Sequence, residues 1–119
     1  MAKILIADDS NSLRNMMQMT LQTKGHQVTA ADNGGCALEL AQNTAFDLVI
    51  TDLNMPFLNG LELVEVLRNQ PEYKYTPMIM LTTESSDERK AFGRSIGVTG
   101  WIVKPFSPQK ILDAVNRVL

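Results

Sequence analysis

Five short runs of apolar residues are spaced along the chain, and turn-forming or polar residues bound each of them. The runs cover residues 3–7, 27–30, 48–52, 77–83 and 100–103. Most of them do not alternate between apolar and polar positions, which is typical of strands buried on both faces of a parallel sheet. The run at 27–30 is shorter and more polar, and it predicts an edge strand. The pattern therefore predicts five strands.

Apolar residues recur at helical spacing after each strand. These positions fall within residues 13–21, 37–41, 63–67, 91–96 and 111–119. A spacing of three to four residues predicts a helix in each interval. Ser85, with Glu88 at capping-box spacing, is expected to open the fourth helix. Ser107, followed by Pro108 at the first helical position, is expected to start the fifth helix.

Strand and helix alternate five times with short connections. This order predicts an α/β fold with a single doubly wound, five-stranded parallel sheet, right-handed crossovers and helices on both faces. A chain of 119 residues is expected to form one domain. Because the chain stops as the fifth helix ends, we expect residues 1–119 to be the whole domain, without an output domain.

Composition narrows the function classes. The net charge is −2, and the basic residues are scattered, so the sequence shows no basic patch of the kind that binds nucleic acid. No apolar run approaches the roughly 20 residues of a membrane helix, and the N-terminus leaves no room for a signal peptide. Cys36 is the only cysteine, which excludes an intrachain disulfide and suggests a reducing compartment. We expect a cytoplasmic monomer that binds neither nucleic acid nor a membrane.

Polar side chains end four of the five predicted strands. They are Asp8 and Asp9, Asp52, Thr82 and Thr83, and Lys104. The carboxyl ends of parallel strands share one edge of the sheet, where open α/β sheets build their sites. Neighbouring carboxylates repel one another, and a divalent cation such as Mg2+ relieves that repulsion. A carboxylate held by a metal and an ammonium group is a plausible nucleophile toward phosphorus.

Taken singly, each of these residues has an ordinary structural explanation, as a helix cap, a turn aspartate, a solvated lysine or a strand threonine. Their joint arrival at one edge favours the functional interpretation. The methionines are interpreted differently, as flexible side chains that fill the core. They include Met16, Met17, Met19, Met78 and Met80.

The order of these motifs resembles a known family. The motifs are Asp8-Asp9, Asp52-Leu53-Asn54-Met55-Pro56, Gly60, Thr82 and Lys104-Pro105-Phe106. They are similar to those of receiver domains of two-component signalling, and most of all to stand-alone chemotaxis regulators of the CheY type. The resemblance runs from Ile4 to the C-terminus and implies a flavodoxin-like sheet with strand order 2-1-3-4-5.

The resemblance also implies roles for individual residues. Asp52 would accept a phosphoryl group from the phosphohistidine of a histidine kinase. Asp9, Asp52 and the backbone carbonyl of Asn54 would coordinate Mg2+, with Asp8 acting through a coordinated water. Lys104 would contact the phosphoryl group.

A second group of residues would form the switch. Thr82 would move toward the phosphoryl group, and the aromatic residue Trp101 would rotate inward behind it. Asn54 and Glu84 would influence hydrolysis of the phosphoaspartate. The bond from Lys104 to Pro105 is expected to be cis. Tryptophan departs from the tyrosine or phenylalanine common at position 101, and its larger ring puts the inward rotation in question.

The resemblance implies a signalling switch rather than an enzyme, with output through the face formed by the fourth helix, fifth strand and fifth helix. A flagellar motor switch is the first candidate target, a pilus or other motility system the second, and a phosphate-sink role the third. Three rival functions remain to be weighed: a flavodoxin-like cofactor binder, a haloacid-dehalogenase-type phosphatase and a receiver that acts without phosphorylation. Asp8-Asp9 would repel a cofactor phosphate, and the phosphatase would need an acid where this chain has Asn54.

Overall fold

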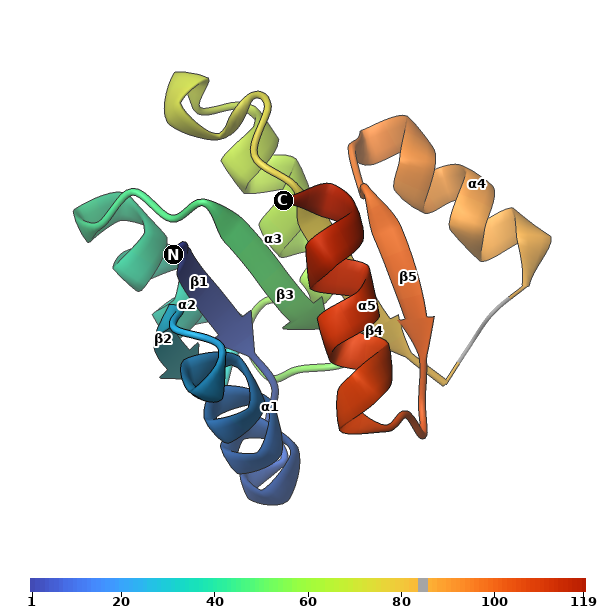
Figure 1. The fold of residues 1–119 in the computed structure, drawn as a ribbon. Helices are drawn as coiled ribbons and strands as arrows, with labels where there is room; N and C mark the ends of the chain where they lie inside the picture. Colours follow the sequence, from blue (N-terminus) through green and yellow to red (C-terminus); the bar gives the residue numbers. More distant parts are fainter. Residues whose placement is uncertain (84–85) are drawn as a thin grey trace.

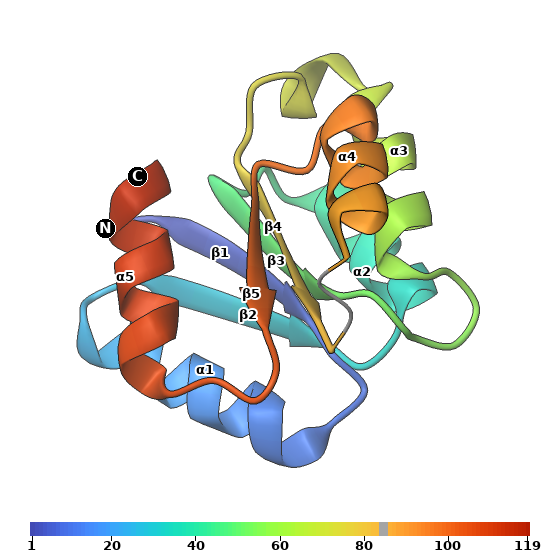
Figure 2. The same ribbon diagram turned by 90° about the vertical axis from the view of Figure 1, so that its right-hand side faces the viewer.

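The fold is a three-layer α/β/α arrangement (Figure 1). The computed structural model describes residues 1–83 and 86–119. Five parallel strands form one sheet in the order β2-β1-β3-β4-β5. Figure 2 shows α1 and α5 on one face of the sheet and α2, α3 and α4 on the other. The predicted fold class and strand order are confirmed.

The elements alternate along the chain as the apolar pattern predicts. The strands are β1 (Lys3–Ala7), β2 (Gln27–Ala31), β3 (Leu48–Asp52), β4 (Met78–Thr82) and β5 (Gly100–Val103). The helices are α1 (Asn11–Thr23), α2 (Gly34–Asn43), α3 (Gly60–Arg68), α4 (Asp87–Ile96) and α5 (Pro108–Val118). A short 3-10 helix, η1 (Pro71–Tyr73), was not predicted. None of the described helices is long and apolar enough to cross a membrane.

Polar side chains cap the N-termini of the helices at the carboxyl edge of the sheet. Ser107 caps α5 by accepting a hydrogen bond from the backbone N–H of Lys110, as predicted. At α4 the prediction was wrong by one residue, because Ser86 accepts the hydrogen bond from the backbone N–H of Arg89. Ser85 and Glu84 lie outside the described residues.

Two hydrophobic clusters, one on each face of the sheet, form the core. Strands β1, β3 and β4 are buried over most of their length and contribute side chains to both clusters. Met17 is buried, but Met19 is 69% exposed, so the expectation that all these methionines fill the core was wrong for Met19. Its position on α1 points away from both clusters, because the buried stripe there follows Met17 and Leu21.

Candidate functional site

Strand register brings the predicted site residues to one edge of the sheet. Ala7 of β1 pairs with Thr51 of β3, so the residues that follow them, Asp8 and Asp52, are neighbours. Thr82 of β4 pairs with Val103 of β5, which places Lys104 just beyond the same edge. The backbone N–H of Lys104 donates to the carbonyl oxygen of Thr82 at 2.9 Å. Parallel pairing thus assembles a site from residues that are far apart in sequence.

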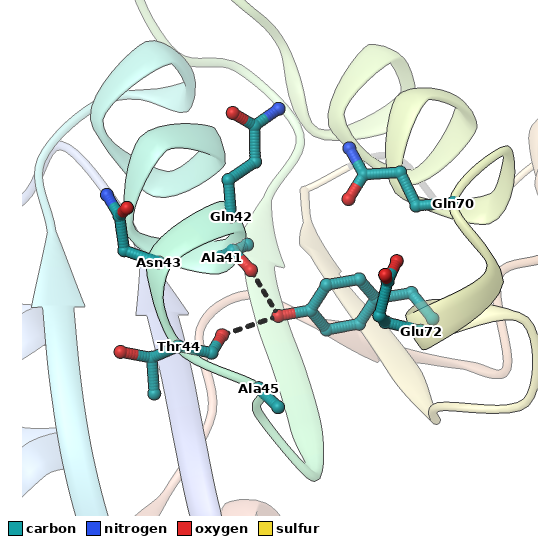
Figure 3. A pocket seen from close by; sticks show the side chains of 8 residues that line it. Ala41, Gln42, Asn43, Thr44, Ala45, Gln70 and Glu72 are labelled. Atoms are coloured by element: carbon teal, nitrogen blue, oxygen red, sulfur yellow. Dashed lines mark hydrogen bonds between the residues drawn. The ribbon is translucent and has the colours of Figure 1, made fainter.

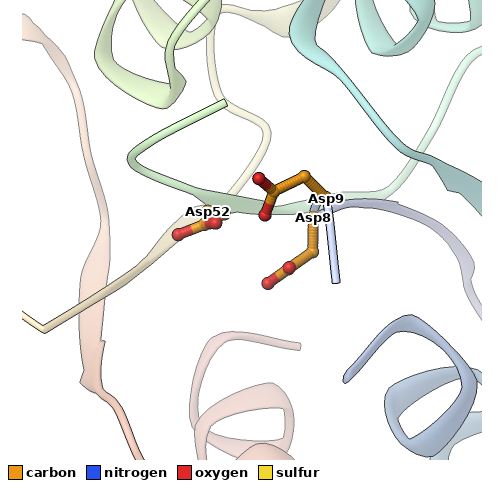
Figure 4. A group of neighbouring side chains, drawn as sticks. All are labelled: Asp8, Asp9 and Asp52. Carbon is orange, nitrogen blue, oxygen red and sulfur yellow. The ribbon is translucent and has the colours of Figure 1, made fainter. Parts of the chain in front are cut away.

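Three carboxylates gather at this edge (Figure 4). Each of Asp8, Asp9 and Asp52 offers a carboxylate oxygen, and these atoms all lie within 4.8 Å of one another. Asp8 is fully buried and Asp52 is 6% exposed, whereas Asp9 is exposed to solvent. Buried like charges at this separation repel strongly. The cluster therefore needs a positive charge.

Lys104 supplies one positive charge. Its Nζ lies 3.1 Å from Oδ2 of Asp8 and 3.2 Å from Oδ1 of Asp52, and its side chain is 17% exposed. The Lys104–Pro105 peptide bond is cis, as expected from the resemblance. Asp9 takes no part in these ion pairs, so one ammonium group bridges only two of the three carboxylates.

The pKa values at the site follow from burial and from this unequal charge. Burial raises the pKa of Asp52, the neighbouring Asp8 raises it further, and Lys104 lowers it, leaving that pKa above its ordinary value. Burial lowers the pKa of Lys104, but Asp8 and Asp52 together outweigh burial, so that pKa also lies above its ordinary value. A simple ion pair would lower the pKa of the acid. The opposite shift at Asp52 follows from burial and from the second carboxylate.

The donor set fits a hard divalent cation. Mg2+ prefers oxygen ligands and is usually held by one or two carboxylates together with waters. Asp9 and Asp52 offer such oxygens, and Asp8 already accepts hydrogen bonds on both of its own, from the backbone N–H of Ser10 at 2.8 Å and from Lys104. Asn54 is exposed two residues beyond Asp52. Three carboxylates, two of them buried, face a single ammonium group, and this excess of negative charge is the observation that favours a metal.

Close packing keeps the loop after β3 near Asp52. The backbone N–H of Gly60 donates to the carbonyl oxygen of Leu53 at 2.9 Å and closes the loop at its base. A Cβ at Gly60 would overlap the carbonyl oxygen of Asp52 and would lie 2.7 Å from Sδ of Met80. Only glycine fits this position without a shift of the backbone, which explains its place in the motif.

The remaining predicted residues lie around this cluster. Thr82, at the carboxyl end of β4, is 1% exposed. Trp101 on β5 is half-buried and packs against the core cluster beneath α3 and α4. No described residue accepts a hydrogen bond from its buried indole Nε1. Glu84 lies outside the described residues, so its predicted role is not tested.

Two contacts near the site were missed by sequence reasoning. A Cβ at Gly93 of α4 would overlap the six-membered ring of Trp101, so the glycine provides the space that the ring occupies. Arg14 of α1 donates from Nη1 to the carbonyl oxygen of Asp8 at 2.7 Å. Neither residue carries a sequence signal of its own, because both contacts depend on how distant elements pack.

A cavity of about 310 Å3 lies at the opposite edge of the sheet, between the C-terminus of α2 and η1 (Figure 3). Its wall includes Tyr73, whose hydroxyl oxygen lies 2.6 Å from the carbonyl oxygen of Ala41 and 2.8 Å from that of Thr44. Burial raises the pKa of Tyr73, which keeps the hydroxyl protonated as a donor. The tyrosine thus joins η1 to α2, and the cavity is not near the acidic cluster.

The fold and site together define a class: a doubly wound parallel α/β domain whose carboxyl edge carries an acidic cluster and a lysine. Comparisons with known proteins specify the family. Residues 4–116 match the response regulator receiver domain. The chain is 40% identical to the chemotaxis protein CheY homolog of Campylobacter jejuni, over 98% of this chain and 92% of that protein. It is 39% identical to the chemotaxis protein CheY1 of Helicobacter pylori, over 98% and 96% of the two chains.

Solved structures agree with this assignment. The chemotaxis response regulator CheY4 of Vibrio cholerae superposes with a TM-score of 0.96 and 50% identity, covering 100% of this chain and 99% of that one. The chain belongs to the response regulator receiver domain family. Receiver domains of the CheY type act as signalling switches, and the chain is similar to them over nearly its whole length.

Proposed function

We propose that this protein is a phosphorylation-dependent response regulator that accepts a phosphoryl group on Asp52. The single observation that carries the proposal is the cluster of Asp8, Asp9, Asp52 and Lys104 at one edge of the sheet. It combines a poorly exposed carboxylate, a fixed ammonium group and oxygen ligands for Mg2+. That combination suits phosphoryl transfer, in which catalysis consists mainly of positioning and of charge stabilisation.

The transfer would proceed from the phosphohistidine of a histidine kinase. A carboxylate oxygen of Asp52 forms a bond to phosphorus while the bond from phosphorus to the histidine nitrogen breaks, and the electron pair of that bond remains on the imidazole. Asp9, Asp52 and the carbonyl of Asn54 would hold Mg2+, with Asp8 acting through a water, and the bound ion would supply positive charge to the phosphoryl oxygens. Lys104 lies within ion-pair distance of Asp52 and would donate a hydrogen bond to a phosphoryl oxygen bound there.

Phosphorylation adds roughly 1.5–2 negative charges and several acceptor oxygens to the site. Thr82, at the end of the adjacent strand, would donate its hydroxyl to this group, and Trp101 and α4 would follow the change. Asn54 and Glu84 would set how fast the phosphoaspartate is hydrolysed. The surface of α4, β5 and α5, together with Pro105, would present the result to a partner.

The partner is proposed to be a motility protein, with a flagellar motor switch first, because relatives 39–40% identical are named chemotaxis proteins. We propose that the regulator works as a cytoplasmic monomer and catalyses only its own phosphorylation and dephosphorylation. The phosphatase rival is disfavoured because Asp52 lies on the third strand and Asn54 stands where that mechanism needs an acid.

The test is labelling of the purified protein by acetyl phosphate, followed by intact mass. The wild type should gain one phosphoryl group in the presence of Mg2+ and none in excess EDTA. Asp52→Asn should gain none under either condition. Asp47→Asn makes the same chemical change at an exposed aspartate just before β3, at the opposite edge of the sheet, and should be labelled like the wild type. Labelling of Asp52→Asn at the wild-type level would rule out Asp52 as the acceptor, and full labelling in EDTA would rule out the metal.

A further inference from the structure

Arg14 bends back from α1 toward the loop that carries two of the acids. Its Nη1 donates to the carbonyl oxygen of Asp8 at 2.7 Å, and its Nη2 donates to the side-chain oxygen of Asn11. Arg14 as a whole is half-buried. Among the described residues it forms no ion pair with a carboxylate, so charge pairing does not explain its position.

Asp8 is fixed from four directions. Its N–H donates to the carbonyl oxygen of Ala31 at 3.1 Å, and its own carbonyl oxygen accepts from Arg14. Its two carboxylate oxygens accept from the backbone N–H of Ser10 at 2.8 Å and from Nζ of Lys104 at 3.1 Å. Every polar atom of this buried residue is therefore engaged, and its orientation is determined.

Asp9 is held much less tightly, although it belongs to the same acidic cluster. It is exposed, and no described residue donates a hydrogen bond to its carboxylate. The position of its N–H and Cα follows the peptide unit that joins it to Asp8. This unit is planar, so its carbonyl oxygen and the N–H and Cα of Asp9 move together. Arg14 donates a hydrogen bond to that oxygen, and this contact from α1 restrains the plane of the peptide unit.

The position and the charge of Arg14 predict opposite effects on the binding of Mg2+. Arg14 bonds a neutral carbonyl oxygen, while Lys104 forms the ion pairs with the carboxylates of Asp8 and Asp52. A guanidinium group near the cluster would, by charge alone, oppose the binding of a cation. If the charge dominated, loss of Arg14 would strengthen Mg2+ binding. If the hydrogen bond dominates, loss of Arg14 weakens it.

We propose that Arg14 is a positioning residue that aims Asp9 into the acidic cluster and thereby sets the affinity for Mg2+. The inference rests on the proposed function, since it assumes that the cluster binds Mg2+. Residues that orient metal ligands typically change metal affinity by about 10- to 100-fold when they are removed. Arg14 orients the backbone of a ligand rather than its side chain, so we place the effect near the lower limit.

Calorimetric titration of the purified protein with Mg2+ tests this inference. Arg14→Met should bind Mg2+ about 10-fold more weakly than the wild type. Arg14→Lys keeps a donor of similar reach and should remain within about 3-fold, because a single hydrogen bond to the carbonyl survives. Arg117→Met removes a charge at the exposed far end of α5 and should leave the affinity unchanged. Equal or tighter binding by Arg14→Met would overturn the inference.

A double mutant with Asp9→Asn separates the positioning of Asp9 from a general effect of Arg14 on the structure. In Asp9→Asn the ligand that Arg14 aims is already impaired, so adding Arg14→Met should cause little further loss of affinity. A further 10-fold loss in that background would overturn the proposed route through Asp9. Asn11→Ala, at the exposed start of α1, removes the side-chain oxygen that accepts a hydrogen bond from Nη2 of Arg14. This variant should also bind Mg2+ more weakly than the wild type, by a smaller factor than Arg14→Met. An unchanged affinity in this variant would also count against the inference.

These results are distinguishable from failure of the proposed function. A wild type that binds no Mg2+ contradicts the metal site itself. A wild type that binds Mg2+, with an affinity that Arg14→Met leaves unchanged, contradicts only the role of Arg14. Circular dichroism of each variant confirms that the comparison is made between folded proteins.

Discussion

Replacing Gly93 by alanine tests how Trp101 is accommodated beneath α4. A Cβ at this position would lie 3.1 Å from Cη2 and 3.2 Å from Cε2 of the Trp101 ring and would overlap Cζ2. Gly93 is also the only buried residue among those described in α4. Alanine is normally better than glycine inside a helix by about 1 kcal/mol. A glycine at this point therefore has a packing reason, which is the ring.

The expected change in stability follows from two opposing effects. Alanine gains about 1 kcal/mol of helix propensity, whereas an extra methyl group in a packed site costs about 1–3 kcal/mol. Gly93→Ala should therefore lower the free energy of unfolding by roughly 0–2 kcal/mol, as the difference of these values. Displacement of the Trp101 ring gives a more sensitive readout than the free energy of unfolding. Its fluorescence should shift to the red and become more accessible to acrylamide, since Trp101 is the only tryptophan.

A double-mutant cycle in urea, followed by circular dichroism, assigns the effect to the ring. In a Trp101→Phe background the smaller ring leaves room, so Gly93→Ala should be neutral or stabilising, with a coupling energy of about 0.5–3 kcal/mol. Gly35→Ala in α2 is the matched control, because its Cβ would meet its nearest atoms only at 3.4 and 3.9 Å. If Gly93→Ala raised stability by the full helix gain and left the fluorescence unchanged, the packing argument would be refuted.

Three further predictions concern charge and buried polar groups. Asp52→Asn should stabilise the metal-free protein near neutral pH. The raised pKa of Asp52 means that folding favours its protonated form, so the wild type loses stability as the pH rises through the folded pKa, and asparagine removes this loss. Urea unfolding at several pH values checks this, and a less stable variant would contradict it. Lys104→Met should destabilise the fold by about 3–5 kcal/mol because it leaves the buried carboxylates of Asp8 and Asp52 unpaired. Because the pKa of Lys104 is raised in the folded state, its ion pairs should stabilise the wild type fully below the ordinary lysine pKa, and this stabilisation should disappear as the pH rises through the folded pKa. A free energy of unfolding that stays constant at alkaline pH would contradict this. Arg68→Met should cost about 2–4 kcal/mol by thermal or urea unfolding, since Arg68 donates to the carbonyl oxygens of Gly97 and Tyr73; a loss below 0.5 kcal/mol would contradict the role of these contacts.

The apolar pattern predicted most of the fold because its signals are local. Each buried run ends at a polar or turn-forming residue, and strand–helix alternation leaves few topologies. The gathering of Asp8, Asp52 and Lys104 at one edge followed from parallel pairing, so it could be inferred without distances. The strand order and the cis bond before Pro105 came from the family resemblance, and the structure confirms both.

What sequence reasoning missed depends on contacts between distant elements. Tyr73 lies between the predicted third helix and fourth strand, where no element was predicted, yet it is buried and its hydroxyl group is hydrogen-bonded to the end of α2. The space for the ring of Trp101 comes from Gly93, eight residues earlier and on another element, whereas the inward rotation of this ring stays a prediction. Arg14 gave no signal at all, because an arginine in the first turns of a helix is ordinary until its hydrogen bond is known.

The central claim, that Asp52 is the phosphoryl acceptor, is tested most directly by locating the modified residue. Protein labelled with acetyl phosphate and Mg2+ is reduced with borohydride, which converts a phosphoaspartate to homoserine, and is then mapped by peptide mass spectrometry. The proposed function predicts homoserine at position 52 and nowhere else. Conversion of Asp8 or Asp9 instead, or a phosphoryl group retained on His26, would contradict it.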